Sequence, residues 1–251
     1  MQIRKNLRNS NFIVFDKRND LLESAAKYLF KLLKSKRNPV IGLATGNTFE
    51  PFYHYISSNY KKFGCSFKNA TTFNLDEYVG LSETDMNSYH YYMNAHLFSK
   101  IDINPSNTFL PDGSSKDLKT EVLSYEKLIC ENNGIDLQFL GIGTNGHIGF
   151  NEPGTNPASI THVVDLSEST ITTNSKYFKN KNMPRRAITM GISTILSSKQ
   201  IVLIATGNSK RNIINKLISG KITQEVPASF LIDHKNTTIM LDKSAGKDLI
   251  G

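Results

Sequence analysis

The hydrophobic positions of this chain follow two patterns, short continuous runs and longer stretches with a helical period. Residues 20–34 place apolar side chains three or four positions apart, which predicts an amphipathic helix. Short apolar runs that stop at polar or glycine-rich segments predict buried strands. We expect strands near Phe12 and at residues 39–44, 70–75, 135–142, 200–205 and 237–241, with further helices at residues 49–60, 87–98, 116–131 and 208–219.

Strands and helices therefore alternate along most of the chain. Right-handed strand–helix–strand units of this kind build a mainly parallel sheet. We predict an α/β fold, a single-domain, Rossmann-like, mainly parallel sheet flanked by helices, with residues 1–251 as one domain. Ligands of such sheets bind beyond the carboxyl ends of the strands, so polar residues there are the first candidates for chemistry.

The charge balance raises the question of a nucleic-acid partner, because 30 Lys and Arg face 22 Asp and Glu, a formal net charge of +8. The basic residues are scattered, and no motif of a nucleic-acid-binding domain accompanies them. We expect most of them to lie on the solvated surface and a few to serve small anionic ligands. No nucleic-acid partner is expected.

The sequence also bears on location. The apolar runs, such as residues 201–205, are too short to span a bilayer, so no membrane partner is expected. The first ten residues lack the apolar core of a secretory signal. Cys65 and Cys130 lie at no metal-ligand spacing, and we expect free thiols in a reducing compartment. These features predict a cytoplasmic protein.

Two predicted strand-to-helix turns have the character of phosphate sites. The first consists of Thr45, Gly46, Asn47 and Thr48, where free backbone N–H groups and the positive end of a helix favour a phosphate. A plain turn with an N-capping Thr is the alternative, and the spacing is not that of a Walker loop. The second turn carries Lys210, a cation where the helix dipole prefers an anion, so an anionic ligand or simple exposure explains it.

Acidic residues end the predicted strand 70–75. Asp76 and Glu77 repel each other, and partial burial raises a carboxyl pKa towards the range that suits a general base. An acidic turn exposed to water is the alternative.

The glycine-rich segment 141–154 contains the strongest signal. It holds His147 and Glu152, and a carboxylate beside a histidine fixes its tautomer and supports acid–base chemistry. Glycines at 141, 143 and 146 also match a dinucleotide-binding spacing, but no helix opens there and no acidic residue ends a second strand about 20 residues later. We therefore expect acid–base chemistry rather than a dinucleotide.

Taken together, these segments resemble the glucosamine-6-phosphate deaminase/isomerase family, in the same order and over nearly the whole chain. The resemblance rests on residues 42–46, 73–81, 88–93, 141–153 and 187–191. Its most specific parts are the Asp-Glu-Tyr-Val-Gly-Leu segment at 76–81 and the Gly-His-Ile-Gly-Phe-Asn-Glu-Pro segment at 146–153. The related 6-phosphogluconolactonases share the fold and a Gly-His pair but lack the Phe-Asn-Glu-Pro continuation.

The resemblance implies that glucosamine 6-phosphate and water become fructose 6-phosphate and ammonia, with no metal and no organic cofactor. It implies that Asp76 moves a proton between C2 and C1. It implies that His147 opens the pyranose ring with support from Asn145 and Glu152. The substrate phosphate would be held by residues 45–48, Lys210 and Lys176.

Three positions depart from the family pattern. Asn145 stands where many members have Asp, and an amide can hydrogen-bond His147 but cannot balance its charge. Asn47 replaces the usual Gly or Ser of the phosphate loop, so its side chain must point away or join the binding. Lys176 replaces a phosphate-binding Arg, which affects affinity more than the type of reaction.

Other readings stay open from the sequence. A related 6-phosphosugar enzyme, of the 6-phosphogluconolactonase type, is the nearest, and a non-catalytic sugar-phosphate sensor is another. A sensor of the transcription-regulator type needs a DNA-binding segment, for which we expect no room before the first strand near Phe12. The family includes monomers, dimers and hexamers, so a homo-oligomer is compatible with the sequence.

Overall fold

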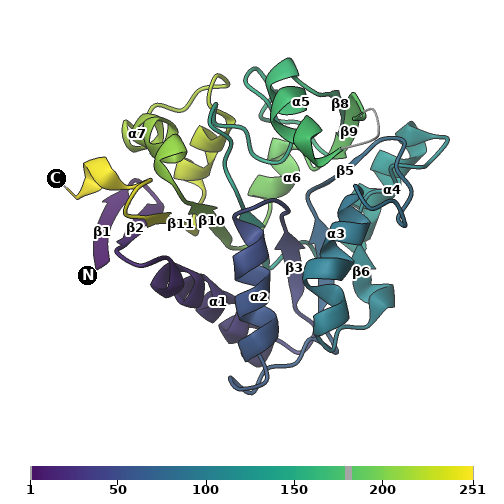
Figure 1. Ribbon diagram of the computed structural model, residues 1–251, viewed down its shortest axis with the longest axis horizontal. Helices are drawn as coiled ribbons and strands as arrows, with labels where there is room; N and C mark the ends of the chain where they lie inside the picture. Colours follow the sequence, from purple (N-terminus) through teal and green to yellow (C-terminus); the bar gives the residue numbers. More distant parts are fainter. Residues whose placement is uncertain (1, 179–182, 251) are drawn as a thin grey trace.

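An eight-stranded sheet forms the centre of the computed structural model, which describes residues 2–178 and 183–250 (Figure 1). Within it, β1 pairs with β2 antiparallel and every other neighbouring pair is parallel, which confirms the predicted mainly parallel sheet. The strands, in their order across the sheet, are β1 (Gln2–Leu7), β2 (Ser10–Phe15), β11 (Thr237–Asp242), β10 (Ile201–Ala205), β7 (Leu137–Leu140), β3 (Val40–Leu43), β4 (Thr71–Asn74) and β6 (Thr108–Phe109).

Helices connect these strands, and those expected from the helical period are found within a few residues of the predicted bounds. The α-helices are α1 (Arg18–Ser35), α2 (Phe49–Asn59), α3 (Tyr89–His96), α4 (Leu118–Glu131), α5 (Glu168–Asn174), α6 (Ile192–Leu196) and α7 (Arg211–Ile218). Short 3₁₀ turns are η1 (Phe98–Lys100), η2 (Pro105–Asn107), η3 (Ser175–Tyr177), η4 (Asn208–Lys210), η5 (Pro227–Asp233) and η6 (Lys247–Leu249). Among the described residues, no helix combines the length and apolar character that a membrane crossing requires.

The N-terminal segment differs from the expectation, because the first strand is β1 and begins well before Phe12. Four of its six residues are polar or basic, so the hydrophobic pattern does not predict it. The strand forms because it pairs with β2 through a tight turn in which Arg8 takes a positive φ of 49°. Arg8 also pairs with Asp233 at 2.9 Å, which ties the turn to η5.

A second, three-stranded antiparallel sheet was not expected from the sequence. It consists of β5 (Asp76–Tyr78), β9 (Arg186–Thr189) and β8 (His162–Asp165), in that order. These strands have only three or four residues, too few for an alternating pattern to be recognised. Figure 1 shows this sheet with α5 above the upper edge of the large sheet. Asp76 and Glu77 lie just past the end of β4, as expected, and they also belong to β5 of the small sheet.

The large sheet is buried against helices. Leu21, Phe52, Tyr53 and Phe139 are each at most 1% exposed, and the rings of Phe52 on α2 and Phe139 on β7 lie 4.9 Å apart. Figure 1 shows α1, α2 and α3 side by side in front of the sheet. Packing of an amphipathic helix face on the sheet, rather than helix propensity, provides most of this stability.

The connections reverse direction between β3 and β7. After β3 the chain moves to β4 and β6 on one side, and after β7 it moves to β10 and β11 on the other. Right-handed crossovers then place the connecting helices of the two halves on opposite faces of the sheet. Loops that leave two such strands diverge and open a crevice, where ligands of doubly wound sheets bind. Residues 45–48 and 141–154 follow these two strands, so the fold brings both predicted motifs to one crevice.

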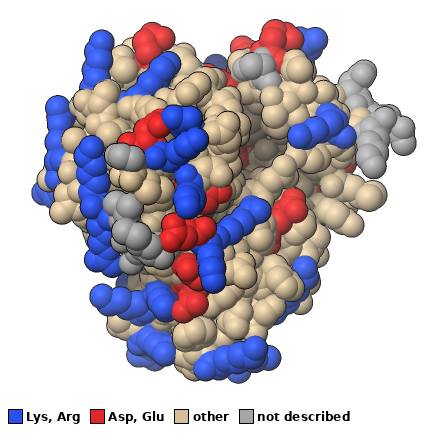
Figure 2. Space-filling model, turned by 60° about the vertical axis from the view of Figure 1, so that its left-hand side comes forward, with Lys and Arg blue, Asp and Glu red and all other residues tan. Residues whose placement is uncertain are grey.

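Basic side chains are spread over the surface rather than gathered in one patch. Figure 2 shows Lys and Arg over one face of the molecule with Asp and Glu among them. The edge strand β1 contributes exposed Arg4 and Lys5, and charge on an edge strand discourages pairing with another chain. This view agrees with the expectation of a solvated charged surface.

At the opposite end of the large sheet, Asp136 is a buried carboxylate that binds two lysines and a backbone amide. It is 7% exposed and accepts hydrogen bonds from Lys36 at 2.6 Å, Lys199 at 2.8 Å and the Val40 N–H at 2.8 Å. Burial would raise the pKa of Asp136, but the hydrogen bonds from Lys199, Lys36 and Val40 outweigh it and hold the pKa below its ordinary value. The carboxylate form is therefore favoured by folding.

We expect Asp136→Asn to lower the free energy of unfolding by about 1–3 kcal/mol at pH 7, since two charge-assisted hydrogen bonds are lost. A depressed pKa stabilises the fold above the ordinary carboxyl pKa, and that stabilisation disappears as the pH falls through the folded-state value. Urea unfolding of both proteins should therefore show a difference that narrows below about pH 4. Asp233→Asn, which removes only the exposed pair with Arg8, is the control and should cost little. A difference independent of pH would contradict this account.

Candidate active site

Residues 45–48 form an open loop between β3 and α2, as the phosphate-site interpretation requires. Gly46 has a φ of 101°, which favours glycine, and its carbonyl accepts a hydrogen bond from the Phe49 N–H at 2.8 Å. The side chain of Thr48 does not cap α2, so the expected alternative of an N-capping Thr is not found. Residues 45–48 thus lie at the positive end of α2, where an anion is favoured.

Tyrosine hydroxyls hold this loop in place. Tyr53 donates a short hydrogen bond to the Ala44 carbonyl, and Tyr92 donates to the Gly46 carbonyl at 3.0 Å. Asn47 accepts a hydrogen bond from the Tyr177 hydroxyl at 3.0 Å. The Asn47 side chain is therefore engaged by η3 rather than pointing freely into solvent.

Asp76 and Glu77 are both buried, at 6% and 1% exposure, so the alternative of an acidic turn in water is wrong. Successive side chains of a strand point to opposite faces, and β5 separates the two carboxylates in this way. Glu77 accepts hydrogen bonds from the N–H groups of Tyr89 and His90, both at 3.0 Å, at the start of α3. Asp76 lies on the other face, beside the glycine-rich loop.

Asp76 has the environment of a base. Burial, together with the negative charge of Glu77, raises the pKa of Asp76 to about 8. No hydrogen bond to its carboxyl group is found within residues 2–178 and 183–250. A carboxyl group that is buried, has no hydrogen-bond partner and has a pKa near neutral pH can accept a proton from a bound molecule.

The glycine-rich loop brings Asn145, His147 and Glu152 together, as expected. Asn145 donates from Nδ2 to Glu152 Oε2 at 2.6 Å and accepts the His147 N–H at Oδ1, at 3.1 Å. The Nδ1 atom of His147 lies 3.5 Å from Glu152 Oε1. Asn145 therefore contacts both partners, and its Nδ2 group donates to Glu152, which an ionised Asp at this position could not do.

Glu152 is held as a carboxylate. Burial would raise its pKa, but His147, the Thr170 hydroxyl at 2.6 Å and the amide of Asn145 outweigh burial and lower the pKa to about 2. Ser167 also donates to Glu152, at 3.0 Å. A permanent negative charge therefore lies beside His147.

Glycines make room for these side chains. A Cβ atom on Gly143 would lie 2.3 Å from Cε1 of His147, which is closer than van der Waals contact allows. A Cβ on Gly149 would lie 2.8 Å from Thr189 Oγ1 and 3.4 Å from Asp76 Oδ2, and Gly149 has a φ of 57°. The loop thus approaches His147 and Asp76 closely because it lacks side chains at these two positions.

Lys210 ends η4, which leads directly into α7, so the helix expected at residues 208–219 is found and opens with a 3₁₀ turn. It is partly buried, and burial lowers its pKa. Over the part of the chain that the structure describes, no acidic group pairs with it. Because an unpaired, partly buried ammonium is costly, an anionic ligand explains this position better than simple exposure does.

Lys176 is exposed, with its Nζ atom 5.0 Å from the ring centre of Tyr177. The adjacent Tyr177 contacts Asn47, so Lys176 lies on a turn that touches the loop of residues 45–48. Contact of Lys176 with an anion stays a prediction.

Sequence reasoning missed two groups at this site. Thr170 and Ser167, which donate to Glu152, come from the short polar segment around α5, and only its run of hydroxyl residues signals them. Tyr177 and its contact with Asn47 join residues 130 positions apart, and no local pattern indicates such a pairing.

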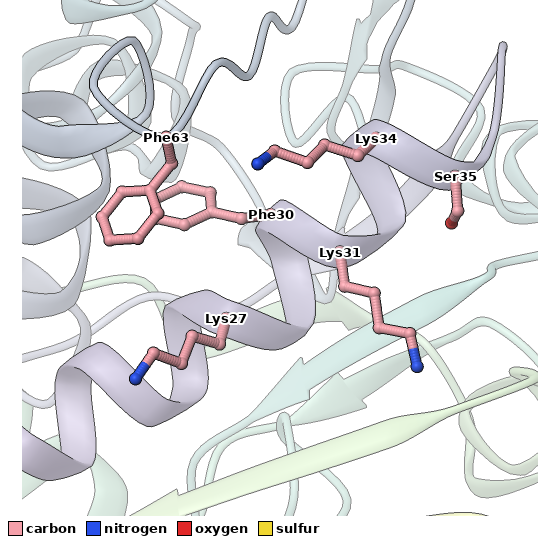
Figure 3. Close-up of a pocket in the computed structure, with 6 residues that line it drawn as sticks. All are labelled: Lys27, Phe30, Lys31, Lys34, Ser35 and Phe63. Carbon is pink, nitrogen blue, oxygen red and sulfur yellow. The ribbon is translucent and has the colours of Figure 1, made fainter.

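A separate surface hollow of about 430 Å³ lies between α1 and the segment after α2 (Figure 3). The stacked rings of Phe30 and Phe63, 5.0 Å apart, form its floor. Figure 3 shows Lys34 extending towards these rings and Lys27 and Lys31 directed away. This hollow lies where the strands begin, away from the crevice, and contains none of the predicted site residues.

Comparison with known proteins identifies relatives over most of the chain. The family model described as glucosamine-6-phosphate isomerases/6-phosphogluconolactonase matches residues 16–240. The glucosamine-6-phosphate deaminase of Oceanobacillus iheyensis is 48% identical over 226 residues, 90% of either chain. Glucosamine-6-phosphate deaminase 1 of Bacillus subtilis is 47% identical over 227 residues, 90% of this chain and 94% of that protein.

Solved structures give the same picture of the fold. A monomeric glucosamine-6-phosphate deaminase superposes with a TM-score of 0.91 at 44% identity, over 94% of this chain and 98% of that one. The 6-phosphogluconolactonase of Thermotoga maritima has a TM-score of 0.75 at 20% identity, over 93% of this chain and all of that one, and shares the fold.

We expect Gly143→Ala to displace the His147 ring while the fold persists, because the new methyl group meets an imidazole that can rotate. The imidazole signals of His147 in NMR spectra should shift, with a small change in melting temperature. Gly141→Ala is the matched control, since its methyl group would meet only Phe49 at an ordinary 3.5 Å. Unchanged His147 signals in Gly143→Ala would show that the loop, not the ring, gives way.

Proposed function

This chain belongs to the family of glucosamine-6-phosphate isomerases and 6-phosphogluconolactonases, and we propose that it converts glucosamine 6-phosphate and water into fructose 6-phosphate and ammonia. The observation that carries the proposal is the buried, unpaired carboxyl group of Asp76 facing the loop of His147 and Glu152. The relatives named glucosamine-6-phosphate deaminase support it, at 47–48% identity over 90% of the chain. We further propose that residues 1–251 act as one domain in the cytoplasm, on amino-sugar phosphates.

The phosphate group of the substrate would bind at residues 45–48 and Lys210. The backbone amides of residues 45–48 would donate hydrogen bonds beside the positive end of α2, and Lys210 would supply a charge that has no other partner among the described residues. Lys176 would add a second, more exposed charge from η3. Binding at the phosphate leaves the sugar between this loop and the glycine-rich loop.

Ring opening comes first, because the C2 hydrogen becomes acidic only when C1 is a carbonyl. His147 accepts the O1 proton and helps to protonate the ring oxygen, while the Glu152 carboxylate stabilises the imidazolium that forms. Asn145 holds Glu152 and His147 in place through its hydrogen bonds to both residues.

Proton transfer follows at Asp76. The carboxylate removes the C2 proton, which gives an enolamine, and returns a proton to C1. The C2 imine that results is hydrolysed by water, and ammonia leaves. Because Asp76 is buried, it is shielded from bulk water and can hold the proton between the two steps.

The alternatives have less support. Lactone hydrolysis requires no base at C2, and the solved lactonases at 20% identity or less share only the fold. A sensor without catalysis requires none of the charge arrangement around His147. A coupled assay for ammonia and fructose 6-phosphate with the purified protein tests the proposal directly, and absence of both products would overturn it.

We expect Asp76→Asn to bind substrate but to lose turnover by about 10²–10⁴-fold, the usual contribution of a positioned base. Exchange of the C2 hydrogen with deuterated water should stop as well. In the unaltered protein kcat/KM should rise with pH up to about 8, where Asp76 becomes ionised. Undiminished exchange in the variant would show that another group is the base.

The same substitution should stabilise the fold. Asp76 binds its proton more tightly when folded, so between the ordinary carboxyl pKa and about 8 the folded state holds more protons and stability falls as the pH rises. Asn has no such penalty. Thermal melting at pH 5 and pH 8.5 should show the variant gaining stability over the unaltered protein at the higher pH.

We expect Lys210→Ala to raise KM by about 10- to 100-fold with a smaller change in kcat, because the phosphate is held alike before and during reaction. Lys176→Ala should raise KM less, since its charge is exposed and screened, and Lys176→Arg should lower KM through a bidentate grip. Lys216→Ala, on the exposed face of α7, is the control. Equal KM values in all four variants would exclude both lysines from the phosphate site.

A further inference from the structure

Residues 148–151 of the glycine-rich loop form a turn that is attached to the small sheet by two buried side chains. Asn151 is 0% exposed and donates from Nδ2 to the Met190 carbonyl, just beyond β9, at 2.8 Å. The Phe150 N–H donates to the hydroxyl oxygen of Thr189, the last residue of β9, at 3.1 Å. The turn is therefore held by β9 and the residue that follows it.

Thr189 lies beside Asp76. The two residues are directly paired on the neighbouring antiparallel strands β9 and β5, so their side chains lie on the same face of the small sheet. Both side chains reach the turn at Gly149, because a Cβ atom there would lie 2.8 Å from Thr189 Oγ1 and 3.4 Å from Asp76 Oδ2. The hydroxyl group that binds the turn and the proposed base therefore lie against the same residue of the turn.

The hydrogen bond from Phe150 to Thr189 is closed to solvent. Thr189 is 0% exposed, and its own hydroxyl hydrogen can be donated to the Met190 carbonyl, 3.3 Å away. Phe150 is buried as well, with its ring centre 5.6 Å from that of Tyr78. Because a buried N–H group requires a partner, loss of the Thr189 oxygen would leave this amide unsatisfied unless the turn moved towards water.

We propose that Thr189 is a positioning residue: it holds residues 148–151 over Asp76 and so keeps the proton that Asp76 carries from C2 to C1 from exchanging with solvent. This inference rests on the proposed role of Asp76 in the deaminase reaction. In the first step the C2–H bond breaks and the proton binds to the Asp76 carboxylate. In the second step the same proton forms a bond to C1. Solvent can remove it only between the two steps, so the fraction that reaches C1 measures how well the turn excludes water.

The test follows a deuterium atom placed at C2 of glucosamine 6-phosphate. Mass spectrometry of the fructose 6-phosphate formed early in the reaction gives the fraction of deuterium transferred to C1, and ammonia release gives the rate. We expect the unaltered protein to transfer part of the deuterium. Thr189→Val keeps the branched shape of the side chain but removes the oxygen, so it should lower the transferred fraction by about twofold or more.

Controls separate this role from a general loss of structure. Thr189→Ser retains the hydroxyl group and should transfer as much deuterium as the unaltered protein. Thr238→Val is the matched control, since it removes a buried hydroxyl of β11 that lies 3.3 Å from the Tyr28 hydroxyl, and it should leave the transferred fraction unchanged. Should Thr189→Val fail to fold, Thr189→Ala removes the same oxygen with a smaller side chain.

Two outcomes overturn the proposal. An unchanged transferred fraction in the folded variant that lacks the Thr189 oxygen, at whatever rate of turnover, would show that Thr189 has a structural role only. Absence of transferred deuterium in the unaltered protein would show that the turn does not keep solvent from Asp76. Failure of the proposed function is distinct from both, because the unaltered protein would then release no ammonia.

Discussion

Leu75 joins the two sheets, and the site depends on the two backbone hydrogen bonds it makes. Its N–H donates to the Leu43 carbonyl of the large sheet at 3.1 Å, and its carbonyl accepts the Met190 N–H beyond the small sheet at 2.7 Å. These bonds fix where β4 ends and β5 begins. A shift of one residue would exchange the directions of Asp76 and Glu77, because side chains alternate along a strand. Asp76 would then point at α3 and Glu77 into the crevice.

The other buried or partly buried acidic side chains each have their own hydrogen-bond donors. Glu77 is satisfied by the start of α3, Glu152 by His147, Asn145 and hydroxyl groups, and Asp136 by lysines at the far end of the sheet. Asp76 and Lys210 differ from these groups, since neither has an ionic partner among the described residues. Unpaired, partly or fully buried groups cost stability, and such cost is typical of positions that a substrate completes.

Contacts between distant segments connect the binding loop to the region around α5. Tyr177 reaches Asn47, and the Tyr78 hydroxyl accepts hydrogen bonds from both Asn174 and Tyr89. These contacts place the segment that donates to Glu152 against the loop proposed for the phosphate.

The sequence by itself determined the alternation of strands and helices and the mainly parallel sheet, because apolar periodicity is a local signal. Its glycine-rich turns and predicted strand ends also pointed to the candidate site residues 45–48, 76, 145, 147, 152 and 210. It did not determine β1, whose polar residues form a strand only by pairing with β2, nor the three-stranded sheet, whose strands are too short for a pattern. Burial of Asp76 and Glu77 on opposite faces, the hydroxyl groups around Glu152 and the contact of Tyr177 with Asn47 were decided by tertiary structure alone. Each depends on segments far apart in sequence, and a local pattern carries no information about which distant groups will desolvate or pair with a given side chain.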